Sequence, residues 1–382
     1  MVLKDVSPNV WSLGLDRVRI ALDRLSHPER SYPHVLVAGT NGKGSTCIYL
    51  ERILSSLGLQ VGTTISPHVS DFTERFRING HNAADEELTE IRAEIEPLLN
   101  DIGLTYFEWC VILAVMIFAR HHVDYGIFEI GLGGRYDAAN ALDPCLCLIT
   151  EISLDHVRYL GSTVEKIAQE KAAIARRGRP LLTTAMDPAL EAIRACAAES
   201  GALFREVQTP SPYRTSLQGS SQPMNAALAT EAAYALGLRP TGSGLAYALA
   251  TAFLPGRIED IGGKVILDVA HNPSSLTELI KYLDKSGFIG VGVFGVLADK
   301  DFPSMIRMLK DACSRLYIAP VQSERSWGAD DMEPFLEPGR VVRFGTIREA
   351  FETALSEGEN IVVAGSFYTV GEIRESVVCA GF

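Results

Sequence analysis

A glycine-rich segment, Gly39-Thr40-Asn41-Gly42-Lys43-Gly44-Ser45-Thr46, follows the apolar run Val35–Ala38 and precedes a helical pattern. Glycines in such a turn let backbone N–H groups converge on a phosphate, and the helix start adds partial positive charge. Lys43 can reach the outer phosphates, while a hydroxyl, which we expect to be that of Ser45, can hold Mg²⁺. Only two residues separate Gly39 from Gly42, and Gly44 follows the lysine, so we interpret the segment as a variant phosphate-binding loop.

Ionisable side chains follow two further apolar runs. Glu129 ends the main part of a predicted strand, Tyr125–Ile130, and glycines stand at 131, 133 and 134. His156 comes shortly after a second predicted strand, Cys145–Thr150. Because open α/β sheets bind ligands at the carboxyl ends of their strands, we expect both side chains at the edge that carries the glycine-rich loop. A carboxylate there suits Mg²⁺. A surface acid and a structural histidine are the alternatives that these residues alone leave open.

Four more sites carry reactive side chains. They are Ser66-Pro67-His68, Lys171 within a helical pattern, Arg257 after a Pro-Gly pair, and the run Asp268–Pro273 with His271 inside it. An isolated lysine on a helix is usually solvated, so Lys171 by itself indicates little. Together the sites predict a Mg-nucleotide held between two domains, with phosphoryl transfer as the chemistry.

Apolar runs alternate with segments of 3.6-residue periodicity, a pattern typical of an α/β fold with a mostly parallel sheet. A further strand is predicted at Pro180–Thr183, and helices are predicted at Thr46–Leu57, Leu88–Leu99, Phe107–Arg120 and Val164–Arg176. Ser162 and Glu165 have the spacing of a capping box, which predicts where the last of these helices begins. The segment Gln208–Pro223, rich in Pro, Ser, Gly and Gln, is predicted to be irregular, with a helix at Asn225–Leu236 behind it.

A second series of strands and helices begins after Leu254-Pro255-Gly256-Arg257 and Gly262-Gly263. Its predicted strands are Val265–Asp268, Ile289–Gly295, Leu316–Ala319, Val341–Phe344 and Ile361–Ala364. We therefore predict a P-loop ATPase domain over 1–254, a hinge over 255–263 and a smaller Rossmann-like domain over 264–382.

Composition limits the partners. Of the 382 residues, 35 are Lys or Arg and 47 are Asp or Glu, and the net charge of −12 disfavours broad nucleic-acid binding. The longest uncharged apolar run, Trp109–Ala119, is shorter than the ~20 residues that span a bilayer. Lys4 and Asp5 lie near the N-terminus with no apolar signal segment behind them, so a secretory signal is not expected. Since the seven cysteines are scattered, zinc and disulfides are not expected. We expect a cytoplasmic monomer with small-molecule partners and no membrane or nucleic-acid partner.

Taken in order, these motifs resemble the folylpolyglutamate synthase and dihydrofolate synthase branch of the Mur ligase superfamily. The resemblance covers nearly the whole chain and rests on the following segments: the variant loop, Ser66-Pro67-His68, Glu74–Gly80, Phe107-Glu108, Glu129–Asn140, Leu154–His156, Glu170-Lys171, Pro255–Arg257, Asp268–Pro273, Asp299–Asp301 and Gly365–Tyr368. It implies that ATP phosphorylates a pteroate or folate carboxylate. The amino group of L-glutamate then attacks the acyl phosphate, which gives an amide, ADP and phosphate.

The resemblance also implies a role for each matched residue. Gly39 to Thr46, Asn225, Arg257 and Asp268 would contact ATP; Ser45, Ser66, Glu129 and His156 would bind metal; Phe107, Glu108, Arg135, Tyr136, Asp137 and Ala138 would flank the pterin; and Lys43, Glu129, His156, Lys171, Arg257 and His271 would be catalytic. Lys171 matches a lysine that family members carry as a carbamate, beside the second of two Mg²⁺ ions. An added anion suits a metal cluster that faces ATP.

Three small departures from the family pattern lie beside these residues: Ala139, Ala173 and Val269. They concern the acceptor more than the chemistry. The alternatives are therefore a Mur-type amide ligase acting on a non-folate acid, and a P-loop nucleotide switch with no ligase activity.

Overall fold

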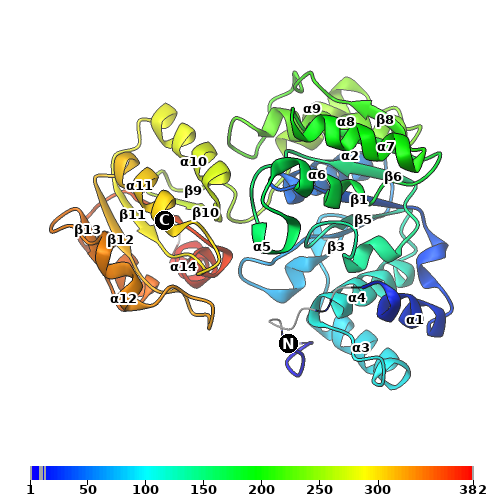
Figure 1. Cartoon of the computed structure of the whole chain (residues 1–382), viewed down its shortest axis with the longest axis horizontal. Helices are drawn as coiled ribbons and strands as arrows, with labels where there is room; N and C mark the ends of the chain where they lie inside the picture. Colours follow the sequence, from blue (N-terminus) through cyan, green and yellow to red (C-terminus); the bar gives the residue numbers. More distant parts are fainter. Residues whose placement is uncertain (1, 8–11, 13, 381–382) are drawn as a thin grey trace. The chain divides into compact units, whose positions relative to one another are not determined.

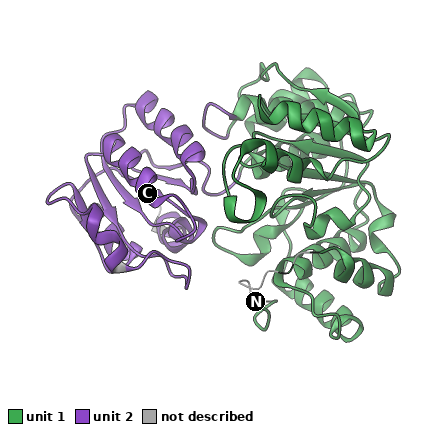
Figure 2. Cartoon of the chain, viewed as in Figure 1, with its two compact units in different colours: residues 1–216, 222–253 green, residues 217–221, 254–382 purple. Residues whose placement is uncertain are grey.

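Two mostly parallel sheets organise the chain, as the alternation of apolar runs predicts. In the computed structural model, which describes residues 2–7, 12 and 14–380, the chain divides into two units. Unit 1 comprises residues 1–216 and 222–253, and unit 2 comprises residues 217–221 and 254–382 (Figure 2). The chain therefore passes between the units three times. The predicted α/β class is confirmed.

Unit 1 contains an eight-stranded sheet in the order β4-β3-β2-β5-β1-β6-β7-β8 (Figure 1). Its strands are β1 (His34–Ala38), β2 (Val61–Thr64), β3 (Phe76–Ile78), β4 (His81–Asn82), β5 (Tyr125–Glu129), β6 (Leu146–Ile149), β7 (Pro180–Thr183) and β8 (Leu203–Glu206). The β2–β3 and β3–β4 pairs are antiparallel, and the other described strand pairs of this sheet are parallel. The register places Val37 opposite Glu129 and Ala38 opposite Ile149, so the segments after β1, β5 and β6 leave the sheet at one edge.

Helices cover this sheet. They are α1 (Asp16–Arg24), α2 (Lys43–Ser56), α3 (Asp85–Leu99), α4 (Tyr106–Arg120), α5 (Val157–Leu160), α6 (Val164–Ala172), α7 (Ala189–Ser200), α8 (Gln222–Ala235) and α9 (Gly242–Ala250), with short 3₁₀ turns at Pro28–Ser31, Phe72–Arg75 and Ala138–Ala141. Helix α2 packs against α8 and α9 (Figure 1), and its residues from Gly44 to Glu51 are all buried. The helix that follows the glycine-rich loop is therefore fixed on several sides.

Unit 2 has a six-stranded sheet in the order β13-β12-β11-β14-β10-β9, of which only β9 is antiparallel. Its strands are β9 (Glu259–Ile261), β10 (Val265–Asp268), β11 (Val291–Phe294), β12 (Arg315–Ile318), β13 (Val341–Arg343) and β14 (Ile361–Ala364). Its helices are α10 (Pro273–Ser286), α11 (Phe302–Ala312), α12 (Ala329–Met332), α13 (Ile347–Ser356) and α14 (Phe367–Ala380), with a 3₁₀ turn at Glu333–Phe335. This arrangement matches the Rossmann-like pattern expected from the second series of strands.

Some element boundaries differ from the predictions. The capping box predicted at Ser162 is wrong, because the hydroxyl of Thr163 accepts the N–H of Lys166 and caps α6. Helix α6 also ends at Ala172, before the predicted Arg176, and α8 begins at Gln222, before the predicted Asn225. Within the described residues, no helix is long and apolar enough to cross a membrane.

Candidate active site

The glycine-rich loop joins β1 to α2, and two of its glycines are required by both conformation and space. Gly39 and Gly42 have φ values of +147° and +86°, which L side chains rarely adopt. A Cβ at Gly39 would lie 1.7 Å from Thr150 Oγ1, and a Cβ at Gly42 would lie 2.5 Å from Asn225 Oδ1. The chain beyond β6 and the start of α8 therefore approach the loop as closely as a backbone without side chains allows.

Lys43 and Glu129 come together at the carboxyl edge of the sheet. Lys43 Nζ lies 3.9 Å from Glu129 Oε1 and donates to the Thr40 carbonyl at 3.1 Å. Glu129, the last residue of β5, is only 5% exposed, and its Oε2 accepts the N–H of Ser66 at 2.9 Å. The structure thus brings three sequence-predicted residues from β5 and from the segments after β1 and β2 to one place.

His156 follows β6, the strand next to β1, and has a strained backbone. Its φ of 48° and ψ of 37° are left-handed, a conformation that is uncommon for a residue other than glycine. Its N–H donates to Asp155 Oδ1 at 2.8 Å, and its Nε2 lies 3.9 Å from the same oxygen. Such strain often marks a functional position, because the surrounding structure must hold it in place.

Lys171 points from α6 into the base of the loop. Its Nζ donates to the Gly39 carbonyl at 2.7 Å, and the residue is only 5% exposed. Burial, with a smaller contribution from the charge of Lys43, lowers the pKa of Lys171 to about 7, against the opposing influence of Asp155, Asp137 and Glu129. The amine therefore releases its proton far more readily than the solvated lysine that an isolated helix position indicates.

The glycine segment after Glu129 is closed by Asp137. The carboxylate accepts N–H groups from Gly131 at 2.9 Å, Leu132 at 3.0 Å and Ala139 at 3.0 Å. Burial raises the pKa of Asp137 to about 6, although these hydrogen bonds oppose the shift. In this turn Ala138 is buried while Tyr136 is 51% exposed.

Helix α6 also holds this turn. Arg135 Nε donates to Glu170 Oε1 at 3.0 Å, and the Arg135 N–H donates to the Glu170 carbonyl at 3.1 Å. The sequence-predicted turn and the helix of Lys171 thus form one hydrogen-bonded structure.

Phe107 and Glu108, at the start of α4, make different kinds of contact. A Cβ at Gly131 would lie 2.6 Å from the Phe107 ring, so Phe107 packs directly on the glycine segment. Glu108 accepts two hydrogen bonds from Arg17, at 2.8 and 3.0 Å, and a third from the Thr105 N–H at 2.8 Å. These contacts make Glu108 part of a capping box that holds α4 in place, and the sequence Thr-x-x-Glu carries that signal.

The start of α8 contacts the loop through two buried amides, of which sequence reasoning identified only Asn225. Gln222 Nε2 donates to Ser45 Oγ at 3.4 Å, and its Oε1 accepts from Asn225 Nδ2 at 3.4 Å. Both residues are buried. The sequence predicts that this helix begins at Asn225 and that Gln222 lies in the irregular segment before it, so the contact of Gln222 with Ser45 is not expected from the sequence.

Three candidates gather in unit 2. Asp268, at the end of β10, is 7% exposed and accepts the N–H groups of Ile258 at 2.7 Å and Ala270 at 2.8 Å. Burial raises the pKa of Asp268, while Arg257 opposes the shift. The Arg257 guanidinium lies 5.1 Å from the centre of the Phe367 ring, and the His271 ring lies 5.9 Å from the same ring. These side chains form one cluster at the carboxyl end of β10.

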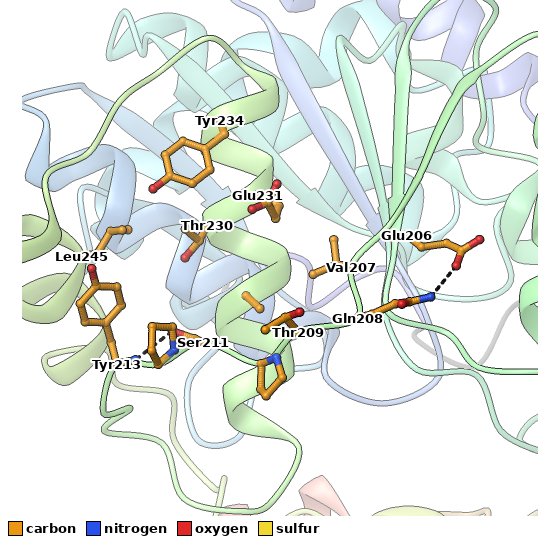
Figure 3. A pocket seen from close by; sticks show the side chains of 13 residues that line it. Glu206, Val207, Gln208, Thr209, Ser211, Tyr213, Thr230, Glu231, Tyr234 and Leu245 are labelled. Atoms are coloured by element: carbon orange, nitrogen blue, oxygen red, sulfur yellow. Dashed lines mark hydrogen bonds between the residues drawn. The ribbon is translucent and has the colours of Figure 1, made fainter.

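A separate open pocket of about 520 Å³ lies elsewhere in unit 1 (Figure 3). It is lined by the segment 206–213, by Ala227, Thr230, Glu231 and Tyr234 of α8, and by Leu245. Glu206 is already bonded to Arg194 and Gln208, and Glu231 to Arg205. Because no predicted site residue lines this pocket, it is not the candidate active site.

The donor set at the carboxyl edge suits a hard divalent cation. In the described part of the chain, no three His, Cys, Asp or Glu residues gather into a ready-made metal cage. Mg²⁺ does not need one, since it is usually held by one or two protein oxygen ligands together with substrate phosphates and water. The Glu129 carboxylate and the hydroxyls of Ser45 and Ser66 have this chemistry, so the residues fit such an ion.

Comparison with known proteins gives the family. Residues 37–220 match the model of the Mur ligase middle domain, and residues 256–367 match that of the Mur ligase glutamate ligase domain. The dihydrofolate synthase/folylpolyglutamate synthase of Escherichia coli K12 is 34% identical, over 98% of this chain and 94% of its own length.

Solved structures agree. That of Escherichia coli FolC in complex with DHPP and ADP has a TM-score of 0.90 at 33% identity, covering 99% of this chain and 96% of its own. A bifunctional folylpolyglutamate synthase/dihydrofolate synthase with Mn, AMPPNP and L-glutamate bound has a TM-score of 0.87 at 32% identity, covering 97% and 95%. Similarity of this extent, spread over both units, means that the chain belongs to the dihydrofolate synthase/folylpolyglutamate synthase family of Mur ligases.

Proposed function

We propose that this protein is an ATP-dependent ligase that joins L-glutamate to the carboxylate of a pteroate or folate and releases ADP and phosphate. The observation that carries the proposal is the pairing of Lys43 with Glu129, 3.9 Å apart at the mouth of the glycine-rich loop. A cation and a carboxylate placed together at a phosphate-binding loop serve phosphoryl transfer, in which catalysis is mostly positioning and charge stabilisation. Relatives with ADP, with AMPPNP and with L-glutamate bound support the substrates.

The reaction proceeds in two steps. A carboxylate oxygen of the acceptor attacks the γ-phosphorus of ATP, and the bond to ADP breaks, which leaves an acyl phosphate. The amino group of L-glutamate then attacks the acyl carbon, loses a proton and expels phosphate. In the first step Lys43 and the N–H groups at the start of α2 stabilise the negative charge on the phosphoryl group.

The divalent metal, which we take to be Mg²⁺, would be held by Ser45, Ser66, Glu129 and His156. We expect two such ions in the site. When bound, the metal neutralises charge on the phosphates. The Ser66 N–H bond to Glu129 fixes that carboxylate, and the Gln222 amide directs the Ser45 hydroxyl. Glu129 and Ser45 are thus oriented by their own neighbours before any ligand arrives.

Lys171 would carry a carbamate. Its neutral amine attacks CO₂, forms an N–C bond and releases a proton, so that the uncharged side chain becomes an anion. The low pKa of Lys171, about 7, supports this reaction, because only the unprotonated amine is nucleophilic. The product would supply a further anionic ligand at the base of the loop.

The remaining candidates would handle the two organic substrates. Phe107 and the turn from Arg135 to Ala138 would flank the pterin ring, since Phe107 packs on the glycine segment and Tyr136 is exposed. Arg257, Asp268 and His271 in unit 2, with Asn225 in unit 1, would serve the nucleotide. Glu108 is better assigned to the fold than to the pterin, because three hydrogen bonds already occupy its carboxylate.

The decisive experiment follows phosphate release by the purified protein with ATP and Mg²⁺. Release is expected only when L-glutamate and one of dihydropteroate, dihydrofolate or tetrahydrofolate are both present, and mass spectrometry should show the acceptor extended by a glutamyl unit. Phosphate release with a different carboxylate and with none of these three would support the ligase assignment and contradict folate as the acceptor. Phosphate release that is independent of both the acceptor and the amino acid would contradict the ligase assignment as well.

A further inference from the structure

Thr150 lies behind the glycine-rich loop and has no role in the mechanism above. It is the first residue after β6 and is completely buried. Its N–H donates to the Ala38 carbonyl at 2.9 Å, which continues the β1–β6 ladder by one residue. Its hydroxyl donates to the carbonyl of Asn41 at 2.6 Å. A buried hydroxyl of the neighbouring strand is thus bonded to the backbone of the loop.

This bond fixes the direction of a peptide group. The carbonyl of Asn41 and the N–H of Gly42 belong to one planar trans peptide, so they point in opposite directions. Because the Thr150 hydroxyl draws the carbonyl toward β6, the N–H of Gly42 must point away from β6. Gly42 is the N-cap of α2, where N–H groups have no partner within the helix and serve anion binding.

The Gly39–Thr40 peptide of the loop is also held from outside, at its carbonyl and at its N–H. Lys171 Nζ donates to the Gly39 carbonyl at 2.7 Å, and the Thr40 N–H donates to the Glu151 carbonyl at 2.8 Å. Thr150 is therefore the third contact in a row, and its side chain is neutral. It can be replaced by a residue of nearly equal shape without altering the charge of the site.

We propose that Thr150 is a positioning residue that presets the loop for phosphate by holding the Asn41 carbonyl away from the phosphate side. Without the hydroxyl, this peptide can rotate, and a carbonyl oxygen turned toward a phosphate repels it. The fit at Gly39, where a Cβ would lie 1.7 Å from Thr150 Oγ1, shows how tightly the threonine is seated against the loop. The inference rests on the proposed function only in taking the ligand to be a nucleotide.

The test is MgADP binding to the full-length protein, measured by calorimetry, with Thr150→Val as the shape-preserving variant and Thr150→Ser as the variant that keeps the hydroxyl. Loss of the hydrogen bond to the Asn41 carbonyl predicts an affinity about tenfold weaker for Thr150→Val. Thr150→Ser should remain within about threefold of the wild type by the same reasoning. In turnover, Thr150→Val should raise the KM for ATP more than it lowers kcat.

Thr183→Val is the matched control. Thr183 ends β7, is also buried, and its hydroxyl accepts the Ala185 N–H at 3.0 Å, away from the loop. The Thr183→Val substitution should lower the thermal stability of the protein and leave its affinity for MgADP unchanged. Equal weakening by Thr183→Val and Thr150→Val would reduce Thr150 to a structural role and overturn the proposal.

The remaining outcomes separate this proposal from the function. Wild-type affinity in Thr150→Val would overturn the positioning role alone, whereas a wild type that binds no MgADP would overturn the proposed function too. If Thr150→Val does not fold, Thr150→Cys, a weaker donor of similar size, takes its place. Equal affinity of the Cys and Ser variants would then count against the proposal.

Discussion

Lys43 and Glu129 give the most direct test at the scale of single residues. Lys43→Ala removes the cation that faces the transferring phosphoryl group and Glu129→Gln removes the carboxylate that would hold the metal, so we expect phosphate release to fall by at least about 100-fold in each. The Tm should change little in Lys43→Ala. Lys166→Ala, at an exposed position on α6, is the control. Activity within about tenfold of the wild type in either variant would argue against the site.

Lys171 predicts a pH dependence of stability. In the folded protein its pKa is about 7 instead of the ordinary 10.5. Between these values the unfolded chain holds a proton that the folded chain has released, so stability rises with pH through this window. In CO₂-free buffer, Lys171→Met should melt at a higher temperature than the wild type near pH 7, and its advantage should shrink toward about pH 9. A constant difference would contradict the buried neutral amine.

At the scale of elements, two adjacent hydroxyl residues at the start of α6, Ser162 and Thr163, have different roles. Thr163 accepts the Lys166 N–H and caps the helix that carries Lys171, whereas Ser162 makes no cap contact. Thr163→Ala should cost about 1 kcal/mol and lower the Tm of unit 1 by about 2–4 °C. Ser162→Ala, the paired control, should melt like the wild type. The reverse result would restore the cap that the sequence spacing predicts.

How far the sequence predicts these elements depends on burial. β1, β5, β6 and β7 were predicted because both faces of each strand are covered, which leaves a continuous apolar run. β8 was not, because its residues alternate between exposed and half-buried at the edge of the sheet. β2, Val-Gly-Thr-Thr, is buried but contains one large apolar residue, since Gly62 must admit the Phe118 ring. Its burial comes from the fold and leaves no pattern in the sequence.

The candidate site shows the same division. The loop and the strand-end position of Glu129 follow from local motifs. The bonds from Lys171 to Gly39 and from Thr150 to Asn41 join residues more than a hundred positions apart, so periodicity and spacing contain no trace of them. Glu108 is placed beside the pterin by the resemblance alone, and the structure adds that its carboxylate completes a capping box with Thr105.

At the scale of the whole molecule, candidate residues occur in both units, so ligation should depend on unit 2. Arg257→Ala removes a cation beside Asp268, and we expect phosphate release to fall by at least about 100-fold while unit 1 retains its Tm. Lys285→Ala, at an exposed position in the last turn of α10, serves as the control. Full coupled turnover in Arg257→Ala would remove this residue from the nucleotide site.

Residues 217–221 leave unit 1 and belong to unit 2, where the Ser221 N–H donates to Glu278 Oε2 at 3.1 Å and Leu217 is buried. A protease that cut the backbone between Leu254 and Arg257 would therefore leave the smaller fragment holding five residues of the larger one. The two pieces would have separate termini and still migrate together in gel filtration. Because the chain enters unit 2 at two separate places, residues 217–221 and residue 254 onward, a single cut in the second connection does not separate the two units.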